Sequence, residues 1–131
     1  MNIALIADEK KKELMVQFCI AYAGVLAKHS ICATATTGRL IEGATGLSIH
    51  KLLSGPQGGA DQIAARISYN EVDVVLYFRD PSTTDAYINE RANVMRLCDV
   101  HNIPVATNIS TAEVIIMALD RGDLDWIELM K

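Results

Sequence analysis

Apolar residues along this chain form short continuous runs, which are separated by polar loops and by stretches of helical spacing. Residues 2–7 (NIALIA) and 72–78 (VDVVLYF) have the length and composition of buried strands. Weaker runs of the same kind predict three more strands, at residues 31–35, 47–52 and 104–107. The pattern therefore provides five strand candidates distributed along the whole chain.

Between the strands, apolar residues recur at steps of three and four, which places them on one face of a helix. Residues 10–28 show this most clearly, because Leu14, Phe18 and Val25 share a face. Other helices are predicted to end near residues 43 and 100 and to occupy residues 61–69 and 110–119. Residues 124–129 are expected to form a last extended segment.

Strands that alternate with helices of this length predict an α/β fold, with helices on both faces of a mostly parallel sheet. The 131 residues suffice for one domain, which we expect to be a single three-layer domain with a five-stranded sheet over residues 1–131. In such sheets ligands bind beyond the carboxyl ends of the strands. That edge is expected to gather residues 7–9, 34–38, 54–61, 79–81 and 107–108.

The composition is typical of a soluble globular protein, since half of the residues are apolar and 21% are charged. A net charge of −4 gives no general attraction to phosphate backbones, so we expect no nucleic-acid partner. No apolar run approaches the ~20 residues of a membrane span. The first apolar stretch is too short for a signal peptide, and its charges follow it instead of preceding it. We therefore expect a cytoplasmic protein without a membrane partner.

The cysteines and histidines do not form a metal-binding pattern. Cys19, Cys32 and Cys98 are widely spaced and lie in apolar contexts, which predicts reduced thiols in the core. The three histidines lack the spacing of metal ligands. We expect neither a metal nor a cofactor.

Residues 34–38 (TATTG) end one predicted strand and begin a helix. Hydroxyl groups and free backbone N–H groups at a helix N-terminus form an anion site. The alternative is a plain helix cap, which needs only one threonine. Residues 10–12 are lysines near the same sheet edge, where one ammonium group could offset the charge of a phosphate. Otherwise these lysines form a solvated surface.

Residues 54–62 (SGPQGGADQ) form a glycine-rich loop before the next helix. Gly55, Gly58 and Gly59 permit positive φ and a close approach to the backbone, and a tight turn alone would not need all three. Asp61 follows at once. It could serve as a general base, or it could be a first-turn acid that complements the helix dipole.

Taken together, these segments resemble the methylglyoxal synthase family. The resemblance covers nearly the whole chain and includes IALIA, TATTG, SGPQGG, DVVLYFRDP and RLCDVHNIPVATN. It implies a five-stranded parallel α/β fold and a homohexamer. Family enzymes convert dihydroxyacetone phosphate to methylglyoxal and inorganic phosphate. The same fold also serves as a ligand-binding regulatory domain in carbamoyl phosphate synthetase, where this chemistry does not occur.

The resemblance assigns phosphate binding to positions that this chain retains. These positions are Lys12, Thr34, Thr36, Thr37, Ser54 and Gly55. One glycine of the family's TGTTG motif is Ala35 here. We expect Asp8 and Asp80 to line the same ligand site.

The resemblance also shows changes at the family's catalytic positions. The family's base directly follows the second glycine, where this chain has Ala60, and Asp61 stands one residue later. The family's histidine-aspartate pair after the first strand corresponds to Asp8 and Glu9. A longer or displaced side chain matters, because a misplacement of ~1 Å can cost ~100-fold in rate.

The loop after the DP motif differs from the family pattern as well. Tyr87 stands at the family's histidine and Glu90 at its second acid. The ring of Tyr87 could stack on a ligand, or the loop could be remodelled so that Tyr87 faces solvent. A family arginine near the C-terminus has no clear match in DLDWIELMK.

A retained phosphate site with altered catalytic positions predicts binding of a phosphorylated small molecule, such as a nucleotide or a nucleotide-derived messenger, without turnover. Such a protein would act as a sensor or would sequester its ligand. The alternative is an active methylglyoxal synthase that uses Asp61 as a displaced base, with Glu9 and Glu90 as its other acids. A third interpretation is an interaction subunit with an empty pocket.

Overall fold

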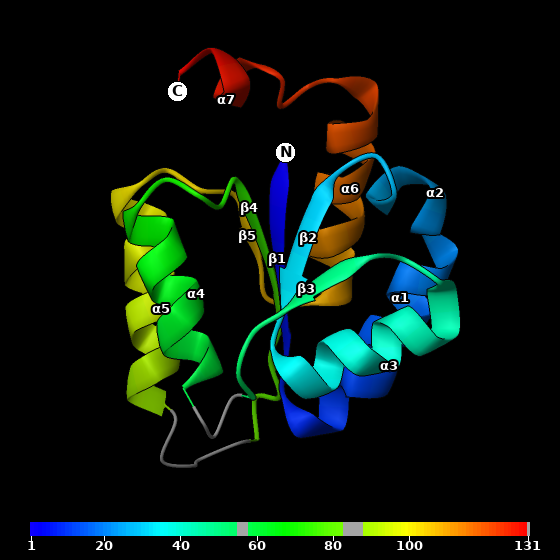
Figure 1. Ribbon diagram of the computed structural model, residues 1–131. Coiled ribbons are helices and arrows are strands. Elements are labelled where there is room, and N and C mark those ends of the chain that lie inside the picture. Colours follow the sequence, from blue (N-terminus) through cyan, green and yellow to red (C-terminus); the bar gives the residue numbers. More distant parts are fainter. Residues whose placement is uncertain (55–57, 83–87, 131) are drawn as a thin grey trace.

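The strands of the computed structural model, which describes residues 1–54, 58–82 and 88–130, form one sheet. In this part of the chain the sheet has five strands in the order β3-β2-β1-β4-β5, and every pairing is parallel (Figure 1). The strands are β1 (Asn2–Ala7), β2 (Ser30–Ala33), β3 (Ile49–Lys51), β4 (Val74–Phe78) and β5 (Val105–Ala106). The prediction of a parallel α/β sheet is therefore confirmed.

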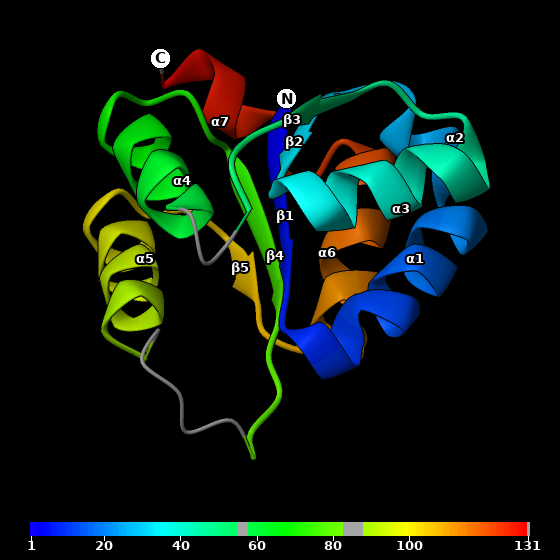
Figure 2. The same cartoon turned by 60° about the horizontal axis from the view of Figure 1, so that its bottom comes forward.

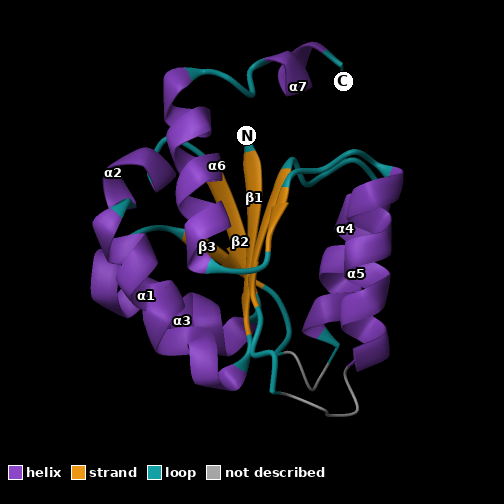
Figure 3. Cartoon of the chain, turned by 180° about the vertical axis from the view of Figure 1, so that it is seen from behind, coloured by secondary structure: helices purple, strands orange, loops and turns teal. Residues whose placement is uncertain are grey.

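Helices cover both faces of the sheet and make three layers. They are η1 (Glu9–Lys11), α1 (Lys12–Ala21), α2 (Ala23–Leu26), α3 (Ala35–Thr45), α4 (Gly59–Ser68), α5 (Ile88–Val100), α6 (Ile109–Arg121) and α7 (Trp126–Leu129). Figure 2 shows α1, α3 and α6 on one face and α4 with α5 on the other, and the same two layers flank the strands from behind in Figure 3.

The central strands are apolar throughout because both of their faces are buried. Successive side chains of a strand point to opposite faces. Leu5 and Leu76 accordingly pack in the core beside α1, α3 and α6, whereas Ala4 and Val75 pack in the core beside α4 and α5. This explains why the two runs that predicted β1 and β4 are the strongest in the sequence.

The predicted single helix over residues 10–28 is interrupted, and this part of the prediction is wrong. Lys11 and Tyr22 leave the helical conformation, with φ/ψ of −108°/0° and −113°/22°. Tyr22 still packs on Phe18, with ring centroids 4.9 Å apart. The spacing of apolar residues continues across the break, because α2 remains against the same core while the chain turns towards β2.

The extended segment predicted at residues 124–129 is also wrong, because these residues form turns and the short helix α7. Gly122 ends α6 in the left-handed region, with φ of 82°. Leu124 and Ile127 are the half-buried residues of the segment, and their separation of three residues suits a helical turn.

Two further sequence-based expectations concern the core and the helices. Cys19, Cys32 and Cys98 are buried free cysteines, as predicted. Burial raises the pKa of the Cys19 thiol to about 12 and that of Cys98 to about 11. Within the described ranges, the helices are too short or too polar to cross a membrane.

Candidate functional site

The carboxyl ends of β1, β2 and β4 bring three polar residues to one edge of the sheet. Asp8 follows β1, Thr34 follows β2, and Asp80 lies two residues after β4. The Asp8 N–H donates to the Phe78 carbonyl over 2.9 Å, which extends the pairing of β1 and β4 by one residue. Because β1 lies between β2 and β4 and neighbouring strands lie only ~4.8 Å apart, Asp8 lies between the other two positions.

The first turn of α3 has the features of an anion site. Thr34 is the N-cap residue, but its side chain makes no capping hydrogen bond. Thr37 is fully buried, and its Oγ1 atom has no hydrogen-bond partner among the described residues. The Ala35 N–H donates to the Leu53 carbonyl. A plain threonine cap, the alternative from the sequence, does not account for this arrangement.

Two glycines bring the start of α4 against that turn. Gly58 has φ of 101°, a left-handed conformation that favours glycine. A Cβ atom on Gly59 would collide with the Leu53 carbonyl oxygen and would lie 2.8 Å from Cγ2 of Thr34. The Gly59 N–H donates to the Ser54 carbonyl over 2.9 Å. These glycines therefore allow the N-termini of α3 and α4 to meet.

Ala60 and Asp61 have opposite environments at the start of α4. Ala60 is buried in the core beside α4 and α5, whereas Asp61 is exposed in the first turn. None of the hydrogen bonds or ion pairs among the described residues involves the Asp61 carboxylate. The two sequence-based interpretations of Asp61, a general base and a dipole-complementing acid, are both compatible with this position.

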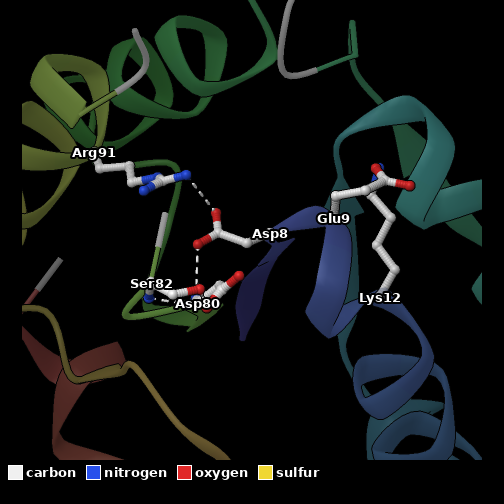
Figure 4. A network of polar contacts seen from close by, with 6 residues as sticks. All are labelled: Asp8, Glu9, Lys12, Asp80, Ser82 and Arg91. Carbon is white, nitrogen blue, oxygen red and sulfur yellow. Dashed lines mark hydrogen bonds and ion pairs between the residues drawn. The ribbon is translucent and has the colours of Figure 1, made fainter. Parts of the chain in front are cut away.

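Lys12 and Glu9 form an ion pair beside the end of β1. The Lys12 Nζ and Glu9 Oε2 atoms are 2.7 Å apart, and the Glu9 side chain is 85% exposed, against 19% for Lys12. In Figure 4 this pair lies on the opposite side of Asp8 from Arg91. The exposed pair contributes little to stability, so Lys12 can exchange Glu9 for an anionic ligand at small cost.

Asp8 is the centre of a buried polar network (Figure 4). Its Oδ2 atom accepts the Asp80 N–H over 2.7 Å, and its Oδ1 atom lies 3.0 Å from a terminal nitrogen of Arg91. Asp80 in turn accepts hydrogen bonds from the N–H and hydroxyl groups of Ser82. Burial and the Asp8 charge raise the pKa of nearby Tyr77 to about 12, although hydrogen bonding with Arg91 acts in the other direction.

Arg91 is a site residue that the sequence analysis missed, although the sequence holds a signal for it. On α5, Arg91 occupies the same helical face as the buried residues Val94 and Cys98. A cation in an apolar row indicates a buried partner, because isolated buried charges are costly. Gly55, Tyr87 and the side chain of Glu90 were predicted site residues, and they lie outside the described residues.

Fold and site together define a parallel α/β protein whose candidate ligand site lies where its central strands end. Residues 15–107 match the model of the MGS-like domain, and the chain belongs to this methylglyoxal synthase family.

Relatives and one solved structure agree with this assignment. A methylglyoxal synthase of Caldicellulosiruptor saccharolyticus is 59% identical over 130 residues, which cover 99% of this chain and 92% of the relative. One of Oceanobacillus iheyensis is 53% identical and covers 100% of this chain and 94% of the relative. The crystal structure of methylglyoxal synthase from Elizabethkingia anophelis NUHP1 superposes with a TM-score of 0.80 at 36% identity, covering 88% of this chain and 76% of that one.

These relatives contradict the interpretation that the chain binds a phosphorylated ligand without turnover. Relatives at 50–59% identity over nearly the whole chain are named as the enzyme, so sensing or sequestration is the wrong conclusion. The error came from giving the four changed positions, Glu9, Ala60, Tyr87 and Glu90, more weight than the similarity of the whole chain. The possible displaced base, Asp61, was recognised but was given too little weight.

Proposed function

We propose that this protein is a methylglyoxal synthase, which converts dihydroxyacetone phosphate to methylglyoxal and inorganic phosphate. The observation that carries the proposal is the 59% identity to a protein of that name over 99% of the chain. The uncapped first turn of α3, with the buried hydroxyl of Thr37, provides a place for the phosphate group of such a substrate.

In this proposal the phosphate group lies at the N-terminus of α3. Backbone N–H groups and the partial positive charge of a helix N-terminus favour an anion there. Thr36 and Thr37 contribute hydroxyl and backbone donors, and Lys12 contributes its ammonium group in place of the bond to Glu9. Thr34 and the segment at Ser54 and Gly55 form the walls of the same site.

Asp61 is the proposed base of the reaction. Its carboxylate removes a proton from the substrate carbon that carries the free hydroxyl group, next to the carbonyl, and an enediolate forms. The electron pair of the enediolate then expels phosphate as the carbon–oxygen bond breaks, and the enol that remains loses its hydroxyl proton and takes up a proton at its methylene carbon to give methylglyoxal. Both oxygens of Asp8 are already engaged by Asp80 and Arg91, whereas Asp61 is exposed in the first turn of α4, which supports Asp61 as the acceptor of the proton.

The test is a coupled phosphate-release assay on the wild type and on Asp61→Asn. Asp61→Asn should lower kcat by about 100-fold or more, because a general base contributes ~10²–10⁴-fold, while the affinity for inorganic phosphate should not fall. Glu113→Gln, at an exposed acid on α6, is the matched control and should leave kcat unchanged. A wild type that does not consume dihydroxyacetone phosphate would refute the proposed function, and full activity in Asp61→Asn would refute the role of Asp61.

We also propose that the protein works as a homohexamer in the cytoplasm. The family resemblance supports the assembly, and so do the exposed apolar side chains of Val114 and Met117, which are three residues apart on α6. Light scattering that shows a stable monomer at micromolar concentration would contradict the hexamer.

A further inference from the structure

Arg91 and Asp8 form a buried ion pair at the carboxyl end of β1, one of the two central strands. Their side chains are 8% and 7% exposed, and the pair joins α5 to the end of β1. Replacing a buried ion pair by apolar residues of similar size is often neutral or stabilising. Stability alone therefore does not explain why two charges occupy this place.

The place itself is where a parallel sheet binds ligands. After β1 the chain continues to α1 on one face of the sheet, and after β4 it continues to α5 on the other face. The crevice at such a switch point, outside the carboxyl ends of the strands, is the usual ligand position of an open α/β sheet. Asp8 and its hydrogen bond to the Asp80 N–H lie at this switch point.

Without a compensating cation, the carboxylates at this edge of the sheet would repel a phosphate ester. Asp8, Glu9, Asp61 and Asp80 all lie around the ends of β1 and β4 or at the start of α4, and a phosphate ester adds up to two negative charges. Glu9 is exposed, so solvent screens its charge. Asp8 is buried, so its charge repels a nearby anion more strongly. Arg91 offsets that charge over 3.0 Å.

We propose that Arg91 is a positioning residue of the substrate site, which fixes the Asp8 carboxylate at the end of β1 and offsets its charge so that a phosphate dianion can bind. The inference rests on the proposed function for the identity of the substrate. The inference can be tested without catalysis, because the affinity for inorganic phosphate depends on the same charges.

The experiment compares three variants with the wild type by calorimetric titration of inorganic phosphate and by KM and kcat for dihydroxyacetone phosphate. Arg91→Met removes the cation and should weaken phosphate binding by about tenfold or more. It should also raise KM more than it lowers kcat. Arg91→Lys keeps the charge and should stay within about threefold of wild type. Asp8→Asn combined with Arg91→Met removes both charges and should recover phosphate binding.

Arg96→Met is the matched control. Arg96 is an exposed arginine on the same helix and bonds to Asn93, so its loss should change neither phosphate binding nor KM. Far-UV circular dichroism checks folding. If Arg91→Met does not fold, Arg91→Gln, which also removes the charge but keeps hydrogen-bond donors, takes its place and should weaken phosphate binding by about tenfold or more.

The proposal is overturned if folded Arg91→Met binds phosphate and substrate as the wild type does, or if the double variant remains as weak as Arg91→Met. A wild type that binds phosphate without turnover would refute the proposed function alone, and the phosphate titrations would still test Arg91. A wild type that binds no inorganic phosphate would overturn the proposal for Arg91, whereas the proposed function is decided by the consumption of dihydroxyacetone phosphate alone.

Discussion

Thr37→Val should weaken phosphate binding and stabilise the empty protein at the same time. The Thr37 side chain is fully buried, and its hydroxyl has no partner among the described residues. Valine has nearly the same shape without the hydroxyl group. If the Thr37 hydroxyl bonded inside the protein, its removal would destabilise the protein. If it bonds only to a ligand, its removal should not destabilise the empty protein.

The expected changes in stability and in affinity depend on whether the Thr37 hydroxyl has no partner or is bonded to phosphate. A buried polar group without a partner costs about 1–3 kcal/mol, so its removal should raise the free energy of unfolding by about 1 kcal/mol in phosphate-free buffer. A hydrogen bond to a charged group contributes about 1.5–3 kcal/mol. Its loss should weaken phosphate binding and raise KM by about 10- to 150-fold.

Urea unfolding measures the first effect, and calorimetric titration of inorganic phosphate measures the second. Thr45→Val is the matched control, because Thr45 lies at the other end of α3 and its hydroxyl is satisfied. That hydroxyl donates to the Ile41 carbonyl over 2.6 Å and accepts the Leu47 N–H over 3.1 Å. Thr45→Val should lose about 1 kcal/mol of stability and should keep the phosphate affinity of the wild type.

The reasoning is refuted if Thr37→Val loses stability like Thr45→Val and binds phosphate as tightly as the wild type. That result would show that the Thr37 hydroxyl is bonded inside the protein and that the phosphate lies elsewhere.

Gly59→Ala should destabilise the protein by about 1–3 kcal/mol in urea unfolding, because its Cβ would overlap the Leu53 carbonyl. Gly43→Ala, where a Cβ would meet nothing within 4 Å, should instead stabilise α3 by about 0.5–1 kcal/mol, and equal effects of the two variants would contradict this. Hydrogen bonds from Lys51 and from a backbone N–H lower the pKa of Glu42 below its usual value. Its stabilising effect is therefore present above the unfolded-state pKa and is lost as the pH falls through the lower folded-state pKa. The difference in urea midpoint between wild type and Glu42→Gln should accordingly be larger at about pH 7 than at about pH 3, and a difference that grows on acidification would oppose the explanation.

Most of the fold was predictable from local pattern. The runs that became β1 and β4 are apolar on both faces because both faces are buried, and this property is readable in the sequence as an uninterrupted apolar segment. The interruption of the first helix at Tyr22 was not readable, because apolar spacing reports which face is buried and does not report where the axis turns. The helical turn at α7 was missed for a related reason, since a segment of a few residues is too short for its period to be recognised.

The candidate site, too, was predictable only in part from the sequence. Residue types and their order were enough to place Thr34, Thr37 and Asp8 after strands, and the rule for parallel sheets brought those strand ends to one edge. Only the folded chain shows that Thr37 is buried with its hydroxyl unpartnered among the described residues, and that Asp8 meets Arg91. Strand and helix periods are local properties of the chain, whereas a buried charge finds its partner through packing between elements that are distant in sequence.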